Sequence, residues 1–136
     1  MSGTDAKRGR ILVVQDDPET ALFTVHVLAN RGGFDVTHTA DPAVALRLAA
    51  AERWDLVVTD TDMPGMTGLE LVDAVRRVAP GLPVAVVTAH PIDSALASRP
   101  GRADEYLEKP LRVGHLLATA TALIGRGRRP YPPPGP

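Results

Sequence analysis

Five short apolar segments, each followed by a helical pattern, constrain the fold of this chain more than any other feature. Three of them are continuous apolar runs that end at turn residues, as is typical of strands buried in a parallel sheet, and the last is a short segment that ends at Pro110. The other, residues 34–39, alternates apolar and polar side chains and predicts a half-buried strand. Strands that alternate with helices predict an α/β fold, with one parallel sheet of five strands and helices on both faces. The predicted strands cover residues 11–14, 34–39, 56–60, 83–89 and 106–109.

The starts and ends of the helices are marked by capping residues. Asp17-Pro18 and Asp41-Pro42 each combine an N-cap with a proline in the first turn. Gly32-Gly33 ends the first helix. The last helix has the clearest amphipathic pattern, whereas the segment between Pro91 and Pro100 has a weak one. The predicted helices begin at Pro18, Asp41, Leu69 and Val113, and the second of them runs through Arg53.

Composition narrows the class of protein. A chain of 136 residues with 44% hydrophobic residues predicts one globular domain. The net charge of -1 argues against a strong electrostatic attraction of the chain to nucleic acid or to a membrane. The absence of cysteine fits a reducing, cytoplasmic environment. We expect a flexible N-terminus over residues 1–9, a folded domain over 10–125 and a disordered tail rich in Arg and Pro over 126–136.

Polar residues stand where four of the predicted strands end. These are Gln15 and Asp16 after the first strand, Asp60 at the end of the third, Thr88 in the fourth and Lys109 at the end of the fifth. Each has an ordinary explanation as a cap, a strand residue or a solvated charge, but parallel strands bring all of them to one edge of the sheet. Two carboxylates there suit Mg²⁺, and a hydroxyl and an ammonium suit a phosphoryl group. The set predicts a phosphoryl site in which a carboxylate is the nucleophile.

Four stretches together resemble the receiver domain of two-component response regulators. They are ILVVQDDPE, DLVVTDTDMPGMTGLEL, VVTAH and YLEKP, and the resemblance covers residues 10–125. It implies a flavodoxin-like doubly wound sheet of strand order 2-1-3-4-5. It also implies a signalling domain rather than an enzyme, one that assists its own phosphorylation and dephosphorylation.

The resemblance assigns roles to the polar residues. Asp60 would accept a phosphoryl group from the phosphohistidine of a sensor histidine kinase or phosphotransfer protein. Asp16, Asp60 and the backbone carbonyl of Asp62 would bind Mg²⁺. Lys109 would pair with the phosphoryl group, and the Lys109-Pro110 bond would be cis.

The resemblance also implies a switch and an output. The Thr88 hydroxyl would move toward the phosphoryl group, and Tyr106 would change rotamer in response. The changed surface would bind a downstream protein that the sequence does not identify, and the resemblance admits a homodimer formed on phosphorylation. Neither nucleic acid nor membrane is an expected partner. The kinase, the pathway, and whether the chain is a complete protein or a fragment stay open.

Gln15 departs from the family pattern, which places an acid there. An amide can hydrogen-bond a water on the metal but adds no charge, so we expect weaker Mg²⁺ binding than with a carboxylate. Gln15 and the weak segment 91–98 also favour an alternative, a pseudo-receiver that binds partners without phosphorylation. A second alternative is a haloacid-dehalogenase-like phosphatase, because Asp60-Thr61-Asp62 resembles the Asp-x-Asp motif of that family.

Overall fold

Within the described residues, strands and helices follow one another in the predicted order, except that the segment between the last two strands, β5 and β6, is not described. The structure is a computed structural model and describes residues 9–61, 65–89 and 103–126. The strands are β2 (Arg10–Val14), β3 (Asp35–Thr39), β4 (Leu56–Asp60), β5 (Val84–Thr88) and β6 (Glu105–Glu108). The helices are α1 (Pro18–His26), the π-helical segment η1 (Val27–Arg31), α2 (Pro42–Ala51), α3 (Gly68–Val78) and α5 (Val113–Arg126).

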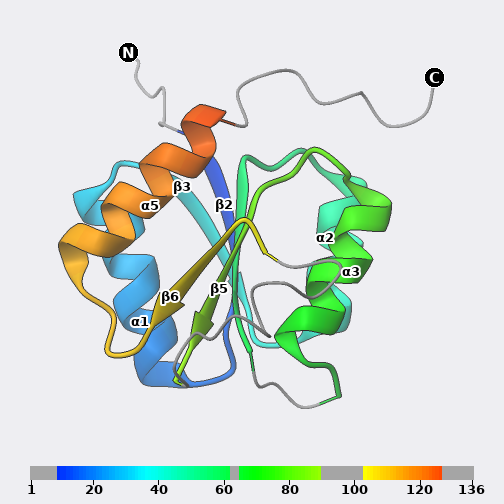
Figure 1. The fold of residues 1–136 in the computed structure, drawn as a ribbon, viewed down its shortest axis with the longest axis horizontal. Coiled ribbons are helices and arrows are strands. Elements are labelled where there is room, and N and C mark those ends of the chain that lie inside the picture. Colours follow the sequence, from blue (N-terminus) through cyan, green and yellow to red (C-terminus); the bar gives the residue numbers. More distant parts are fainter. Residues whose placement is uncertain (1–8, 62–64, 90–102, 127–136) are drawn as a thin grey trace.

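The strands form one parallel sheet with helices on both faces. The strand order is β3-β2-β4-β5-β6, which is 2-1-3-4-5 in chain order, and every pairing is parallel. In Figure 1, α2 and α3 cover one face of the sheet, and α1 and α5 cover the other. The predicted doubly wound, flavodoxin-like fold is therefore confirmed.

The core divides into two layers because alternate side chains of each strand point to opposite faces. On β2, Leu12 and Val14 join the cluster under α2 and α3, whereas Ile11 and Val13 join the cluster under α1 and α5. All five residues of β4 and of β5 are buried, as expected for central strands of a parallel sheet.

The capping signals act as predicted at both proline-started helices. The Asp17 carboxylate accepts a hydrogen bond from the Thr20 N–H at 2.9 Å, and the Asp41 carboxylate accepts one from the Ala43 N–H at 2.9 Å. Helix α2 ends at Ala51, two residues before the predicted end. Glu52 is already extended, and the chain turns there to bury Trp54.

A π-helical segment follows α1, which the sequence did not predict. The Gly32 N–H donates to the Val27 carbonyl at 3.0 Å, a bond that spans five residues. Val27 and Leu28, the first two residues of this segment, are both buried in the core. Gly33 then reverses the chain at a φ of 73°, a conformation that favours glycine.

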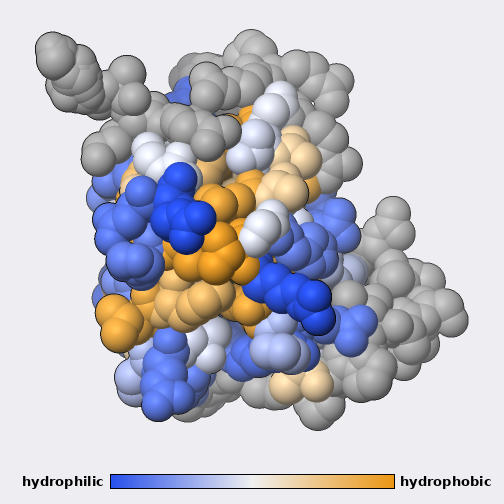
Figure 2. All heavy atoms as spheres, turned by 90° about the vertical axis from the view of Figure 1, so that its left-hand side faces the viewer, coloured by the Kyte–Doolittle hydropathy of each residue, from blue (hydrophilic) through white to orange (hydrophobic). Residues whose placement is uncertain are grey.

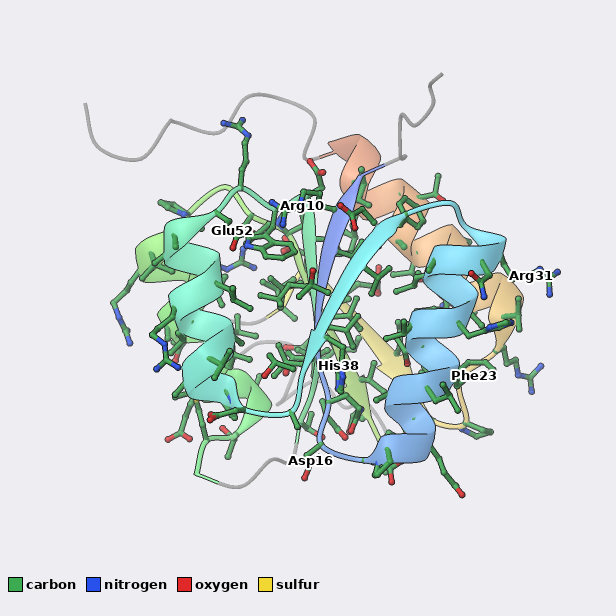
Figure 3. The ribbon with its side chains drawn as sticks, turned by 180° about the vertical axis from the view of Figure 1, so that it is seen from behind. Arg10, Asp16, Phe23, Arg31, His38 and Glu52 are labelled. Carbon is green, nitrogen blue, oxygen red and sulfur yellow. The ribbon has the colours of Figure 1, made fainter. Side chains whose placement is uncertain are left out.

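Arg10 lies at the end of the sheet opposite to the strand C-termini (Figure 3), and Trp54 precedes the start of β4. The Arg10 guanidinium stacks over the indole ring at 4.1 Å from its centroid and pairs with Glu52 at 2.7 Å. Trp54 is 1% exposed, and its indole N–H donates to the Leu48 carbonyl. This cluster ties β2 to the end of α2.

Three earlier expectations fall on parts of the chain that the structure does not describe. They are the N-terminus over residues 1–9, of which only Gly9 is described, the weak helical segment 91–98, and the tail over 126–136, of which only Arg126 is described. No helix within residues 9–61, 65–89 or 103–126 is long and apolar enough to cross a membrane.

Candidate functional site

Asp60 ends the central strand β4 and faces a lysine from the edge strand. Its side chain is 8% exposed, and its Oδ2 lies 3.1 Å from Lys109 Nζ. Lys109 follows β6 directly, and its own N–H donates to the Thr88 carbonyl at 2.8 Å. Two of the residues that the sequence assigned to the site are thus in direct contact.

Thr61 holds the other oxygen of the Asp60 carboxylate. The Thr61 N–H donates to Asp60 Oδ1 at 2.7 Å, and the Thr61 hydroxyl lies 3.4 Å from the same atom. The two carboxylate oxygens are therefore different: Oδ1 is fixed by the next residue of the chain, and Oδ2 by a cation. Thr61 was not among the predicted site residues, although it directly follows the predicted acceptor in the sequence.

The loop after β2 brings Gln15 and Asp16 to the same edge of the sheet. Gln15 is 3% exposed, and its Oε1 accepts a hydrogen bond from the Asp17 N–H at 3.0 Å. Asp16 is exposed and lies at the lower edge in Figure 3, where the strands end. His38 Nε2 lies 2.8 Å from the Gln15 carbonyl oxygen, so β3 also supports this loop.

The alternation along each strand separates these side chains between the two faces. Leu56 and Val58 of β4 lie in the layer under α1 and α5, and Asp60 continues their register. Lys109 likewise follows Leu107 onto that face. Thr88 and Tyr106 belong to the opposite face. Thr88 continues the alternation of Val84 and Val86, which lie in the layer under α2 and α3, and Tyr106 packs against that layer. Acceptor and lysine share one face, and the two predicted switch residues share the other.

The predicted switch residues are packed at this edge. Thr88 is 1% exposed. Tyr106 is half-buried, and its phenolic oxygen accepts a hydrogen bond from the Ala103 N–H at 3.2 Å. The Lys109-Pro110 peptide bond is cis, as expected from the resemblance. Asp62, the predicted donor of a backbone carbonyl, lies outside the described residues.

Gly68 lets the start of α3 approach the acceptor strand. Its N–H donates to the Thr61 carbonyl at 2.7 Å. A Cβ atom at this position would lie 2.3 Å from the Asp60 carbonyl oxygen and 2.8 Å from Thr61 Cα. Thr67 and Glu70 close a reciprocal capping box around the same helix start. Gly68 was not among the predicted site residues.

Asp17 caps α1 beside the site, and its surroundings lower the pKa of its carboxyl group. The largest cause is the hydrogen bond from the Thr20 hydroxyl, followed by the Thr20 N–H, with a further contribution from the Lys109 charge. A carboxyl whose pKa is lowered by folding stabilises the fold above its unfolded pKa, and that stabilisation is lost as the pH falls through the folded pKa.

We therefore expect Asp17→Ala to lower the free energy of unfolding at pH 7, and the difference from the parent protein to shrink as the pH falls below about 4. Urea denaturation at pH 7 and pH 3 measures both values. Thr20→Val removes the hydrogen bond from the Thr20 hydroxyl, which is the largest cause of the lowered pKa, and should reduce the pH dependence of the free energy of unfolding. If Asp17→Ala lowers the free energy of unfolding by the same amount at pH 7 and pH 3, the carboxylate does not have this role.

A pocket of about 210 Å³ opens beside Lys109, between α1 and the loop that precedes α5. It is lined by Glu19, Thr20, Phe23, Lys109, Pro110 and Leu111. Figure 2 shows an apolar area on this side of the molecule, bordered by polar side chains. Leu22 of α1 is 73% exposed, which is unusual for so large an apolar side chain.

The donor set at this edge fits a magnesium ion. Across the part of the chain that the structure covers, no cluster of three or more His, Cys, Asp or Glu residues is placed to hold a metal. Asp16 and Asp60 supply two carboxylates at the strand ends. Mg²⁺ is commonly bound by one or two carboxylates, with water and phosphate oxygens completing an octahedral shell, so two acids suffice.

Comparison with known protein families and sequences identifies one family. Residues 11–121 match the model of the response regulator receiver domain. The transcriptional regulatory protein PrrA of Mycobacterium tuberculosis is 36% identical over 118 residues, which cover 86% of this chain and 50% of PrrA. The chain thus spans about half the length of the curated relatives it matches.

Solved structures of receiver domains have the same fold. The receiver domain of the Francisella response regulator 1452 superimposes with a TM-score of 0.80 at 26% identity, covering 88% of this chain and 99% of that domain. The receiver domain of the sensor histidine kinase PA1611 from Pseudomonas aeruginosa gives a TM-score of 0.76 at 25% identity, covering 88% and 99%. That structure contains a magnesium ion coordinated in its active-site cleft.

Proposed function

The chain belongs to the response regulator receiver domain family, and on that premise we propose that Asp60 is its phosphoryl acceptor. Receiver domains are signalling domains of two-component phosphorelays. The observation that carries the proposal is the buried Asp60 carboxylate, whose Oδ2 lies 3.1 Å from Lys109 Nζ at the C-terminal edge of the sheet. Ligands of open α/β sheets bind at that edge.

The chemistry follows from the two distinct oxygens of Asp60. We assign Oδ2 as the nucleophile, because Oδ1 accepts the short hydrogen bond from the Thr61 N–H. Oδ2 forms a bond to phosphorus as the N–P bond of the donor phosphohistidine breaks, and the electron pair of that bond stays on the imidazole. Lys109, released from Oδ2, then neutralises an oxygen of the transferred phosphoryl group.

Asp16 and Asp60, with the Asp62 carbonyl, are the residues we assign to Mg²⁺. The ion supplies positive charge against the phosphoryl oxygens when it is bound. Thr88 and Tyr106 are proposed as the switch: the hydroxyl approaches the phosphoryl group, and the ring, held in this state by the Ala103 N–H, changes rotamer. The two side chains share one face of neighbouring strands, which supports their coupling.

The proposed phosphoryl donor is a sensor histidine kinase or phosphotransfer protein. The apolar area around the pocket beside Lys109 supports contact with a protein rather than a small donor alone. Phe23, Pro110 and Leu111 line the pocket together with Lys109, and Leu22, next to Phe23 in the sequence, is exposed. A partner that covers them excludes water and brings its phosphohistidine to the strand ends. A downstream protein that reads the phosphorylated surface completes the proposed relay.

Incubation with acetyl phosphate and Mg²⁺ tests the function without a kinase. Intact mass spectrometry should show the gain of one phosphoryl group, and EDTA should prevent it. No mass gain at any Mg²⁺ concentration would favour the pseudo-receiver instead. Continuous release of phosphate from a phosphate monoester would favour the phosphatase alternative.

A further inference from the structure

Gln15 is buried at the end of β2, and only the oxygen of its side-chain amide has a hydrogen-bond partner among the described residues. The residue is 3% exposed, and Oε1 accepts the Asp17 N–H at 3.0 Å. Since an N–H can only donate, this bond fixes which end of the amide is oxygen. Among the described residues, Nε2 has no hydrogen-bond partner. A buried amide group without a partner is rare in native proteins and calls for a ligand or water that supplies one.

The strand register places residue Gln15 next to Asp60. Val14 of β2 lies opposite Thr59 of β4, so the next residues along the two strands are Gln15 and Asp60. Gln15 also continues the register of Ile11 and Val13, which point into the layer under α1 and α5. Asp60 and Lys109 follow that same face. Gln15 and Asp60 therefore follow neighbouring strands on one face, and Lys109, which follows the strand beyond β5, reaches Asp60 Oδ2 at 3.1 Å.

The chemistry of the amide decides what it can bind there. The –NH₂ group offers two donors and no acceptor. A water bound to Mg²⁺ is a strong donor and a poor acceptor, so it is a bad partner for Nε2, whereas the oxygens of a phosphoryl group are good acceptors. Oε1 could still accept from such a water, but one of its lone pairs already serves the Asp17 N–H.

We propose that Gln15 Nε2 donates a hydrogen bond to the phosphoryl group carried by Asp60. This inference rests on the proposed function of Asp60. It gives Gln15 a catalytic role in contact with the transferred group, in place of the carboxylate that the family pattern puts near the metal. With Gln15 in place of an acid, the site loses one negative charge that would attract Mg²⁺ and gains one neutral hydrogen-bond donor to the phosphoryl group.

The side-chain amide can be observed directly. Gln15 is the only glutamine in the chain and Asn30 the only asparagine, so the ¹H–¹⁵N spectrum contains two side-chain NH₂ pairs. Asn30 Nδ2 lies 2.8 Å from His26 Nδ1, at the far end of α1, and is an internal control. The protein is titrated first with Mg²⁺ alone and then with beryllofluoride, a stable analogue of the phosphoryl group.

The expected result is a downfield shift of the Gln15 NH₂ protons on addition of beryllofluoride, beyond any change caused by Mg²⁺, with Asn30 unchanged. If the Asp60 and Thr61 backbone signals respond but the Gln15 amide does not, the inference is overturned and the function of Asp60 stands. The inference is also overturned if the Gln15 amide responds fully to Mg²⁺ alone. If no signal near Asp60 responds, the proposed function itself fails.

Gln15→Glu is a matched variant, because it keeps the oxygen that accepts the Asp17 N–H and replaces the donor by a charge. We expect Mg²⁺ alone to bind about tenfold more tightly to this variant. At saturating Mg²⁺, we expect beryllofluoride to bind about tenfold more weakly. Calorimetry measures both constants. Beryllofluoride binding that is unchanged or tighter in Gln15→Glu would overturn the proposed donor.

Discussion

Replacing Asp60 by asparagine is expected to abolish phosphorylation by acetyl phosphate completely. The amide keeps an oxygen that can accept the Thr61 N–H, so the end of β4 stays in place. It removes the anionic Oδ2 that faces Lys109 Nζ at 3.1 Å, and a neutral amide is not a competent nucleophile toward phosphorus. Intact mass spectrometry after incubation with Mg²⁺ and acetyl phosphate should show only the unmodified protein.

Asp73→Asn is the matched control for that experiment. Asp73 is an exposed residue of α3, so the same chemical change is made away from the strand ends. This variant should gain one phosphoryl group as the parent protein does. Labelling of Asp60→Asn at the parent level would show that another residue is the acceptor, and the role assigned to Asp60 would be wrong.

Gly68→Ala is expected to destabilise the protein by about 1–3 kcal/mol, the usual cost of adding atoms to a closely packed site. The new Cβ would lie 2.3 Å from the Asp60 carbonyl oxygen and 2.8 Å from Thr61 Cα, and neither backbone atom can move alone. Relief of the clash must shift the end of β4 or the start of α3. Urea denaturation should show the loss, and phosphorylation by acetyl phosphate should slow because Asp60 is displaced.

Gly114→Ala makes the same change where space is free. A Cβ on Gly114 meets no atom within 4 Å, and the residue lies within helix α5. Alanine is favoured over glycine in a helix by roughly 0.5–1 kcal/mol, so this variant should be unchanged or slightly more stable. Equal effects of the two substitutions would mean that the contact between Gly68 and the acceptor strand is not a constraint.

Most of the architecture follows from local sequence patterns. Continuous apolar runs identified the central strands, and Asp-Pro pairs identified two helix starts, because both signals act over a few residues. The patterns did not contain the strand order or the contact between Asp60 and Lys109, which are 49 residues apart. Those expectations came from the resemblance to receiver domains.

The features that sequence reasoning missed depend on contacts in three dimensions. The hydrogen bond from Thr61 to Asp60 requires a particular turn after β4, and the clearance at Gly68 depends on where α3 begins relative to that turn. The π-helical segment after α1 was missed because its hydrogen bonds span five residues, which the local sequence pattern does not distinguish from those of an α-helix. Helix α2 ends before Arg53 because the chain becomes extended at Glu52 and buries Trp54.

The placement of Trp54 makes it a natural reporter of folding that is insensitive to the chemistry of the site. It is the single tryptophan of the chain and precedes β4, so the full length of that strand separates its ring from Asp60. Its emission should respond to loss of the Arg10 stacking and of burial when the protein unfolds. It should stay constant while Mg²⁺ or a phosphoryl group binds at the other end. Stability and signalling can therefore be recorded as separate signals from the same unlabelled molecule.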